Sequence, residues 1–110
     1  MESNVAGIKT TLVELIVNIS SRIDDIVNEY NSSGIFDSNR LYNLFDDLQA
    51  LAEGADAIKE FYRDIDLLEL REKLDMIERA MESQDKLLLA DLLEYELRDM
   101  LAFWERILSN

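Results

Sequence analysis

The sequence contains no cysteine, no histidine and no proline. Without cysteine the chain can form no disulfide, no thiolate nucleophile and no zinc–thiolate site. Without histidine it lacks the commonest metal ligand and the one side chain whose unperturbed pKa lies near neutral pH, so most hydrolytic, zinc and di-iron sites lose an essential part. We therefore predict a protein that is not an enzyme and that holds no cofactor or metal ion.

Long apolar runs are also missing. The longest, residues 87–90, falls far short of the roughly 20 residues that span a bilayer. Residues 1–4 lack the basic segment that opens a secretory signal. With 48% hydrophobic and 32% charged residues, the composition is that of a folded, soluble chain. We expect a single cytoplasmic domain over residues 1–110, with one core.

Basic residues are scarce relative to acidic ones. The chain has 24 aspartates and glutamates against 11 lysines and arginines, which gives a formal charge of −13. This charge opposes binding to nucleic acid and to anionic lipid, and it means that any charged partner should be basic. We expect a protein partner or self-association as a homodimer, and no nucleic acid, membrane or small-molecule substrate.

What the sequence does contain is helical periodicity. Apolar residues recur at steps of three and four, and without proline nothing local breaks the stretches that carry them. The pattern predicts four helices, at residues 5–30, 38–64, 66–83 and 86–108. Gly34 suits the left-handed region after the first helix, and Asp37 or Ser38, Asp66 and a residue of Ser83–Asp85 are predicted N-caps of the others. Short connections favour an all-α, antiparallel up-and-down four-helix bundle.

The second helix is predicted to carry a narrow seam. Its apolar stripe, from Leu41 to Ile65, shrinks to small residues around Gly54, where a neighbouring helix could approach closely. We place Ala55 in this seam. The apolar residues that follow have a different helical phase, which predicts a tight turn just before Asp66.

The last predicted helix is more apolar than one partner face requires. Its large apolar residues cover more than one side, and they are Leu87, Leu88, Leu89, Leu92, Leu93, Leu97, Met100, Leu101, Phe103, Trp104, Ile107 and Leu108. Either this helix packs centrally, or part of its surface meets a partner protein or a second copy. The candidate contact residues are Leu101, Phe103, Trp104 and Leu108, with ordinary core packing as the alternative. At least one of Leu101, Phe103 and Leu108 should stay partly exposed.

Glu96 borders this apolar stripe. A carboxylate there would need a donor such as Arg22 of the first helix, a tyrosine hydroxyl or a helix terminus, because an unpaired buried charge is strongly unfavourable. We therefore take Glu96 and Arg22 as candidate buried or half-buried polar residues. The alternative for Glu96 is a half-exposed acid at the edge of the core.

Carboxylates are the only catalytic groups present in quantity. Pairs such as Glu69 with Glu72 would place two acids on one helical face, but di-iron bundles also need Glu-x-x-His pairs, which this chain cannot supply. A run that opens like a calcium loop at Asp64 has leucines where oxygen ligands are needed. Doublets such as Asp24–Asp25 and Asp46–Asp47 are compatible with an acidic mimic of nucleic acid, although they are common on acidic helices.

Residues 89–97, which read LADLLEYEL, and the downstream Trp104 resemble a family of small acidic helical-bundle proteins of Gram-positive bacteria. Residues 51–58 are similar to a helix of the same family that contains a Glu-Gly pair. The resemblance implies a helical bundle and brings no particular activity with it, and the family often has proline where this chain has Asp99. In size and acidic helical architecture the chain also resembles flagellar export chaperones.

These patterns favour a non-catalytic protein-interaction module, similar in role to a secretion or flagellar export chaperone, that offers an apolar helical surface with an acidic rim. The alternative functions are an acidic nucleic-acid mimic or inhibitor of a basic protein, and a carboxylate metal-binding bundle.

Overall fold

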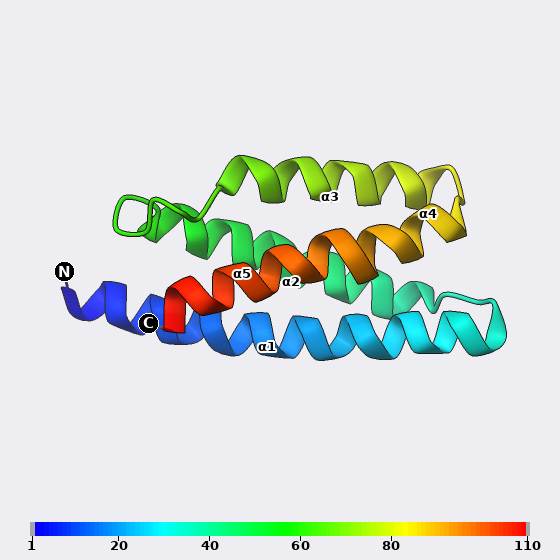
Figure 1. Ribbon diagram of the computed structural model, residues 1–110, viewed down its shortest axis with the longest axis horizontal. Helices are drawn as coiled ribbons and strands as arrows, with labels where there is room; N and C mark the ends of the chain where they lie inside the picture. Colours follow the sequence, from blue (N-terminus) through cyan, green and yellow to red (C-terminus); the bar gives the residue numbers. More distant parts are fainter. Residues whose placement is uncertain (1, 110) are drawn as a thin grey trace.

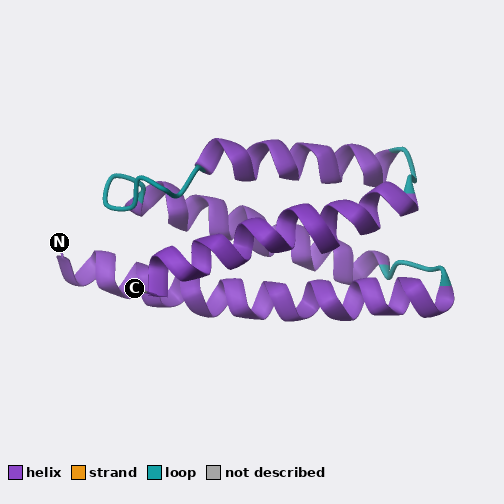
Figure 2. Cartoon of the chain, in the orientation of Figure 1, coloured by secondary structure: helices purple, strands orange, loops and turns teal. Residues whose placement is uncertain are grey.

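The stretches with helical periodicity form four helical rods in the computed structural model, which describes residues 2–109 (Figure 1). The elements are α1 (Glu2–Ser33), α2 (Ser38–Ile58), α3 (Leu67–Glu82), α4 (Lys86–Asp91), the π-helical segment η1 (Leu92–Leu97) and α5 (Arg98–Ser109). The last three follow one another without a break and form a single rod. Successive rods alternate in direction and their connections lie at the two ends of the molecule (Figure 2). The predicted all-α, up-and-down bundle is therefore confirmed, and residues 2–109 contain no strand.

The starts of the second, third and fourth predicted helices have the expected caps. The side chains of Asp37, Asp66 and Asp85 accept a hydrogen bond from the backbone N–H three residues later, at 3.2, 3.1 and 3.2 Å respectively. These bonds satisfy amides that have no partner within the helix. Gly34 has a φ of 74° after the end of α1, and its N–H donates to the carbonyl of Tyr30 at 2.7 Å, as in a left-handed C-terminal cap.

The end of the second helix was predicted wrongly. α2 ends at Ile58 rather than at residue 64, and the tight turn expected before Asp66 is a longer connection of single turns. The N–H of Phe61 donates to the carbonyl of Ile58, and the N–H of Ile65 donates to that of Tyr62, both at 3.0 Å. Ile65 is nevertheless buried. The apolar stripe marks burial correctly here, but a chain of turns delivers Ile65 to the core as well as a helix would.

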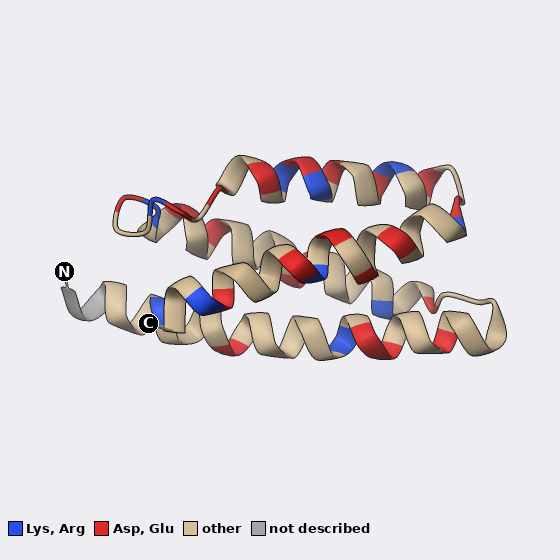
Figure 3. Cartoon of the chain, in the orientation of Figure 1, with Lys and Arg blue, Asp and Glu red and all other residues tan. Residues whose placement is uncertain are grey.

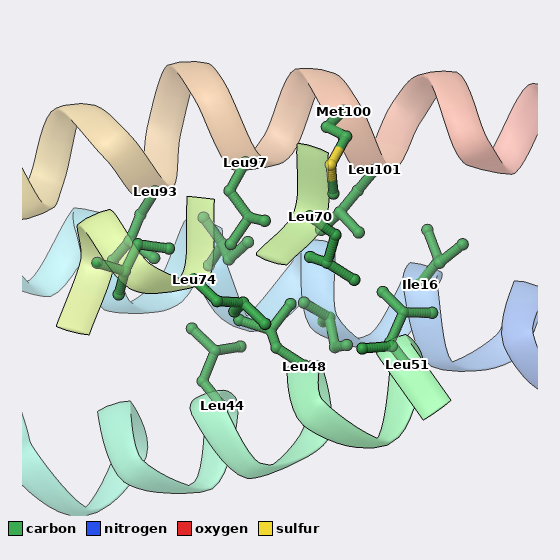
Figure 4. Close-up of a cluster of buried hydrophobic side chains, with 14 of the residues drawn as sticks. Ile16, Leu44, Leu48, Leu51, Leu70, Leu74, Leu93, Leu97, Met100 and Leu101 are labelled. Carbon is green, nitrogen blue, oxygen red and sulfur yellow. The ribbon is translucent and has the colours of Figure 1, made fainter. Parts of the chain in front are cut away.

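The core lies along the bundle axis. Side chains from all four rods meet there (Figure 4), because α1 packs against α2, η1 and α5, and α3 packs against α2, α4 and η1. The apolar stripes predicted for the first two helices supply the buried residues on those sides. Ala55 and its neighbour Ala52 are almost fully buried, and Leu12 of α1 lies close against Gly54 of α2, as the seam prediction requires.

The last rod buries most of its large apolar residues, and it contains the π-helical segment η1. The N–H of Arg98 donates to the carbonyl of Leu93, five residues back, so this hydrogen bond encloses one more residue than a bond of α-helical spacing and the turn is wider. The buried residues Leu89, Leu93, Leu97 and Leu101 are each four apart. Residues four apart do not lie exactly above one another on an α-helix, so a stripe of such residues turns slowly around the helix. The wider π turn offsets part of that rotation. Most of the apolar residues of this helix are thus buried in the core, against α1 and α3, and not free to meet a partner.

Candidate functional site

Three of the four residues predicted to contact a partner lie in the core. Leu101 and Trp104 are 0% exposed and Leu108 is 1% exposed, so a partner cannot reach them while the bundle is closed. They follow one another at steps of three and four, which is the inward stripe of α5. The indole N–H of Trp104 is buried without an acceptor among the described residues. The contact role predicted for these three residues is therefore corrected to core packing.

Phe103 is the exception among the four. Its side chain is 43% exposed, so the prediction that one of these residues stays partly exposed is confirmed. The guanidinium of Arg106 lies over the ring, 5.8 Å from its centroid. Phe103 is adjacent in sequence to the buried Trp104 and therefore projects about 100° away from it around the helix.

Glu96 and Arg22 do not pair with each other. The Glu96 side chain is 48% exposed and lies 3.6 Å from Nζ of Lys73 on α3, so Glu96 is the half-exposed acid at the edge of the core that was the alternative prediction. Arg22 is half-buried and forms an ion pair with Asp47 of α2. Arg22, one of the donors considered for Glu96, is not its partner, because Arg22 faces α2 whereas Glu96 faces α3.

A groove runs along the surface seam between α2 and α3. It consists of adjoining pockets of about 400, 280 and 200 Å³. The first and second pockets share Tyr42 and Met81, and the second and third share Phe45 and Glu78, so they form one continuous furrow. We call it the α2–α3 groove. Its walls include Leu41, Tyr42, Phe45 and Gln49 from α2, and Leu74, Glu78, Met81 and Glu82 from α3.

Two connections close one end of this groove. The α1–α2 loop contributes Ile35 and Phe36, and the ring of Phe36 stacks on that of Tyr30 with centroids 4.3 Å apart. The α3–α4 turn contributes Gln84, whose φ of 57° is unusual for a residue other than glycine. The N–H of the next residue, Asp85, donates to the carbonyl of Ala80 at 3.0 Å, which is the long bond of a Schellman motif. Stacking and capping thus hold this end of the groove in place.

The groove gathers five large apolar residues that are not fully buried. Ile35 is 60% exposed and Tyr42 is 62% exposed, while Phe36, Phe45 and Met81 are half-buried and pack against the core with their inner sides. All five line one connected depression.

The acidic doublets do not form an array of free carboxylates. Asp24 pairs with Arg98 of α5 at 2.9 Å, and Asp47 pairs with Arg22, so one member of each doublet is neutralised by a base. Within residues 2–109, no group of three or more acids is placed to hold a metal ion. The pKa of Asp56 lies below its ordinary value because Lys59 donates a hydrogen bond to the carboxylate and adds a favourable charge, but this pair lies on the surface and outside the groove.

Sequence reasoning missed the groove because its residues belong to no single stripe. Tyr42 and Phe45 lie three apart on α2, beside the core stripe, while Ile35 lies in a loop and Met81 near the end of α3. The usable signal was the cluster of aromatic and large apolar residues at positions 35, 36, 42 and 45, which exceeds what one core stripe needs. No pattern along the chain links this cluster to Met81, because only the bundle brings the two together.

None of the helices within residues 2–109 is both long enough and apolar enough to cross a membrane. No curated protein and no solved structure matches the chain. One family model does match it, described as Domain of unknown function (DUF8042), and the match covers residues 8–107 and so includes part or all of every helix. The chain therefore belongs to the DUF8042 family.

Proposed function

We propose that this protein is a non-catalytic, chaperone-like interaction module that receives a helical segment of a partner protein in the α2–α3 groove. The observation that carries the proposal is the continuity of the groove, whose pockets share lining residues along two antiparallel helices. A furrow between two helices matches the shape of a third helix, which buries its own apolar face there.

The geometry of the groove supports a helix better than it supports a compact ligand. The α2 wall extends from Ser38 to Gln49, which corresponds to about 16 Å along the helix axis. A rod of about three turns would cover that length, with apolar residues one turn apart meeting Ile35, Tyr42 and Phe45 in succession. The apolar side chains are spread along the groove instead of converging on one point.

The test uses an amphipathic model peptide of about 16 residues, with leucines on one face and glutamines on the other. We expect saturable binding by fluorescence anisotropy, with amide chemical-shift changes concentrated on α2 and α3. Tyr42→Ser should weaken binding severalfold. Tyr95→Ser is the matched control, because Tyr95 is 60% exposed on η1 and lines none of the three pockets.

Both variants remove an exposed ring, so both should keep the parent's melting temperature within a few degrees. Equal loss of binding in the two variants, or shift changes centred on Phe103, would contradict the proposed site. Absence of binding by any amphipathic helix would contradict the proposed function.

A further inference from the structure

The charges along the α2–α3 groove are unevenly placed. Glu78 and Glu82 are the only charged side chains that line the middle pocket, and they lie one helical turn apart on α3. Neither forms an ion pair with another described residue, whereas the nearby Asp75 pairs with Arg79 at 3.0 Å. The middle of the groove therefore presents two uncompensated carboxylates beside apolar walls.

The two ends of the groove differ in charge. Lys86 is the charged residue that lines the first pocket, whereas Arg71 lines the third pocket together with the acids Asp75 and Glu78. The negative charge of the middle pocket therefore continues into the third pocket. Acidic side chains also occur on all four rods outside the groove (Figure 3). In the middle of the groove, the two acids adjoin exposed Tyr42 and half-buried Phe45 and Met81.

Resting on the function proposed above, we infer that the occupant of the groove is a basic amphipathic helix whose apolar face meets Tyr42, Phe45 and Met81, with two Lys or Arg side chains one turn apart facing Glu78 and Glu82. Charge complementarity carries this choice. A carboxylate beside an apolar wall attracts a cation more strongly than one in open water, because the local dielectric is lower.

A second copy of this chain fits the groove less well. Each copy carries a formal charge of −13, so association would bring like charges together around the two central glutamates. A partner helix with basic residues removes that repulsion and also neutralises Glu78 and Glu82. Since the groove accommodates about three turns, the partner segment is short enough to be only marginally helical on its own, and it becomes ordered when it docks.

The experiment compares three labelled peptides of about 16 residues with the same leucine face and with lysine, glutamine or glutamate on the polar face. We expect the lysine peptide to bind the parent protein at least about tenfold more tightly than the glutamate peptide at about 0.05 M salt, and the gap to narrow at about 0.3 M. The glutamine peptide should lie between them.

Variants then separate the groove from the overall charge. The double variant Glu78→Gln, Glu82→Gln should bind the lysine peptide more weakly, with an affinity close to that of the glutamine peptide. Its affinity for the glutamine peptide should equal that of the parent protein. The matched control is Glu14→Gln, Asp99→Asn, which removes the same charge from exposed positions on α1 and α5 that line none of the three pockets. It should retain most of the preference for lysine.

Each outcome decides between the hypotheses. Equal binding of the three peptides, or an equal effect of the two double variants on the lysine peptide, would overturn the basic-helix inference while leaving the helix-binding function in place. No binding by any of the three would overturn the proposed function itself. Sedimentation showing a dimer that Tyr42→Ser dissociates would assign the groove to a second copy and would overturn the inference as well.

Discussion

Leu12 of α1 fills the space that a side chain at Gly54 of α2 would need. A Cβ placed on residue 54 would lie 2.5 Å from Cδ2 of Leu12, well inside van der Waals contact. The two helices approach closely at this point, which explains why a glycine stands in the interior of α2 despite its poor helix propensity. Leu12 also borders an open depression with Leu15 and Ala50, so its terminal methyl has room to turn aside.

Two opposing effects then decide the outcome of Gly54→Ala. Alanine stabilises the helix by about 1 kcal/mol relative to glycine, and displacing Leu12 destabilises the protein by a similar amount. We therefore expect the free energy of unfolding to change by less than about 1 kcal/mol. In a Leu12→Ala background the clash is absent, and the same substitution should stabilise by about 1 kcal/mol. Urea denaturation of the four proteins of this double-mutant cycle measures the difference. Identical effects in the two backgrounds would show that the residues do not interact.

The neighbouring Ala55 has no comparable free space. It is 1% exposed, so Ala55→Leu should overpack the seam and lower the free energy of unfolding by about 1 to 3 kcal/mol. The control is Ala57→Leu, two residues further along and exposed, which should change stability by less than about 0.5 kcal/mol. Thermal melts followed by circular dichroism compare the two. A neutral Ala55→Leu would mean that this face of α2 does not pack against the bundle.

Gly54 and Ala55 also show which features could be predicted from the sequence. The spacing of apolar residues and the chemistry of helix caps are local properties, so the four rods, the aspartate caps and the seam at these two residues could be predicted. The end of α2 could not, because Ile65 is buried whether it arrives by a helix or by turns. The π turn at η1 could not be predicted for a related reason. Apolar residues spaced four apart are compatible with an α-helix whose apolar stripe winds slowly around it and with a wider turn, and only packing against α1 and α3 selects the wider turn.

The candidate site was harder to predict because surface grooves are formed between elements. One of Leu101, Phe103 and Leu108 was correctly expected to stay partly exposed, but the sequence did not show that it would be Phe103. Tyr42 and Met81 lie on different helices and meet only because α2 and α3 run side by side. Amphipathic periodicity identifies which residues a helix buries. It does not say which of the remaining apolar residues gather into one surface.

The two apolar neighbours on α5 should respond differently to substitution. Phe103→Glu places a charge at a 43% exposed position, so we expect a loss below about 1.5 kcal/mol and a folded protein. Leu101→Ala opens a cavity at a fully buried position and should lower the free energy of unfolding by about 2 to 5 kcal/mol. The single tryptophan, Trp104, reports on the core through its fluorescence in urea. Unfolding of the Phe103→Glu protein in plain buffer would show that Phe103 is core.

The net charge predicts that salt stabilises the fold. With a formal charge of −13, repulsion between acids opposes compaction, and added salt screens it. Raising sodium chloride from about 0.02 M to 0.5 M should raise the melting temperature by several degrees, which corresponds to about 1 kcal/mol. The variant Asp25→Asn, Asp46→Asn should show a smaller rise because it carries less charge. A falling melting temperature would instead mean that ion pairs such as Asp24–Arg98 dominate.

The turn at the end of the groove contains a residue under backbone strain. Gln84 has a φ of 57°, a left-handed conformation that is unfavourable by about 1 to 2 kcal/mol for a residue with a Cβ. Glycine adopts it without that penalty but has about 0.5 to 1 kcal/mol more conformational entropy to lose on folding. Gln84→Gly should therefore stabilise the protein by about 0.5 to 1 kcal/mol.

Ser83→Gly is the matched control for this last change. Ser83 precedes Gln84 and has a right-handed conformation, with φ of −81°, that suits a residue with a Cβ, so glycine there should be neutral or destabilising. Denaturation in urea measures both variants, and amide exchange at Asp85, whose N–H closes the turn, reports on the motif directly. If Gln84→Gly destabilises the protein, the side chain of Gln84 contributes a contact to the groove that outweighs its backbone strain.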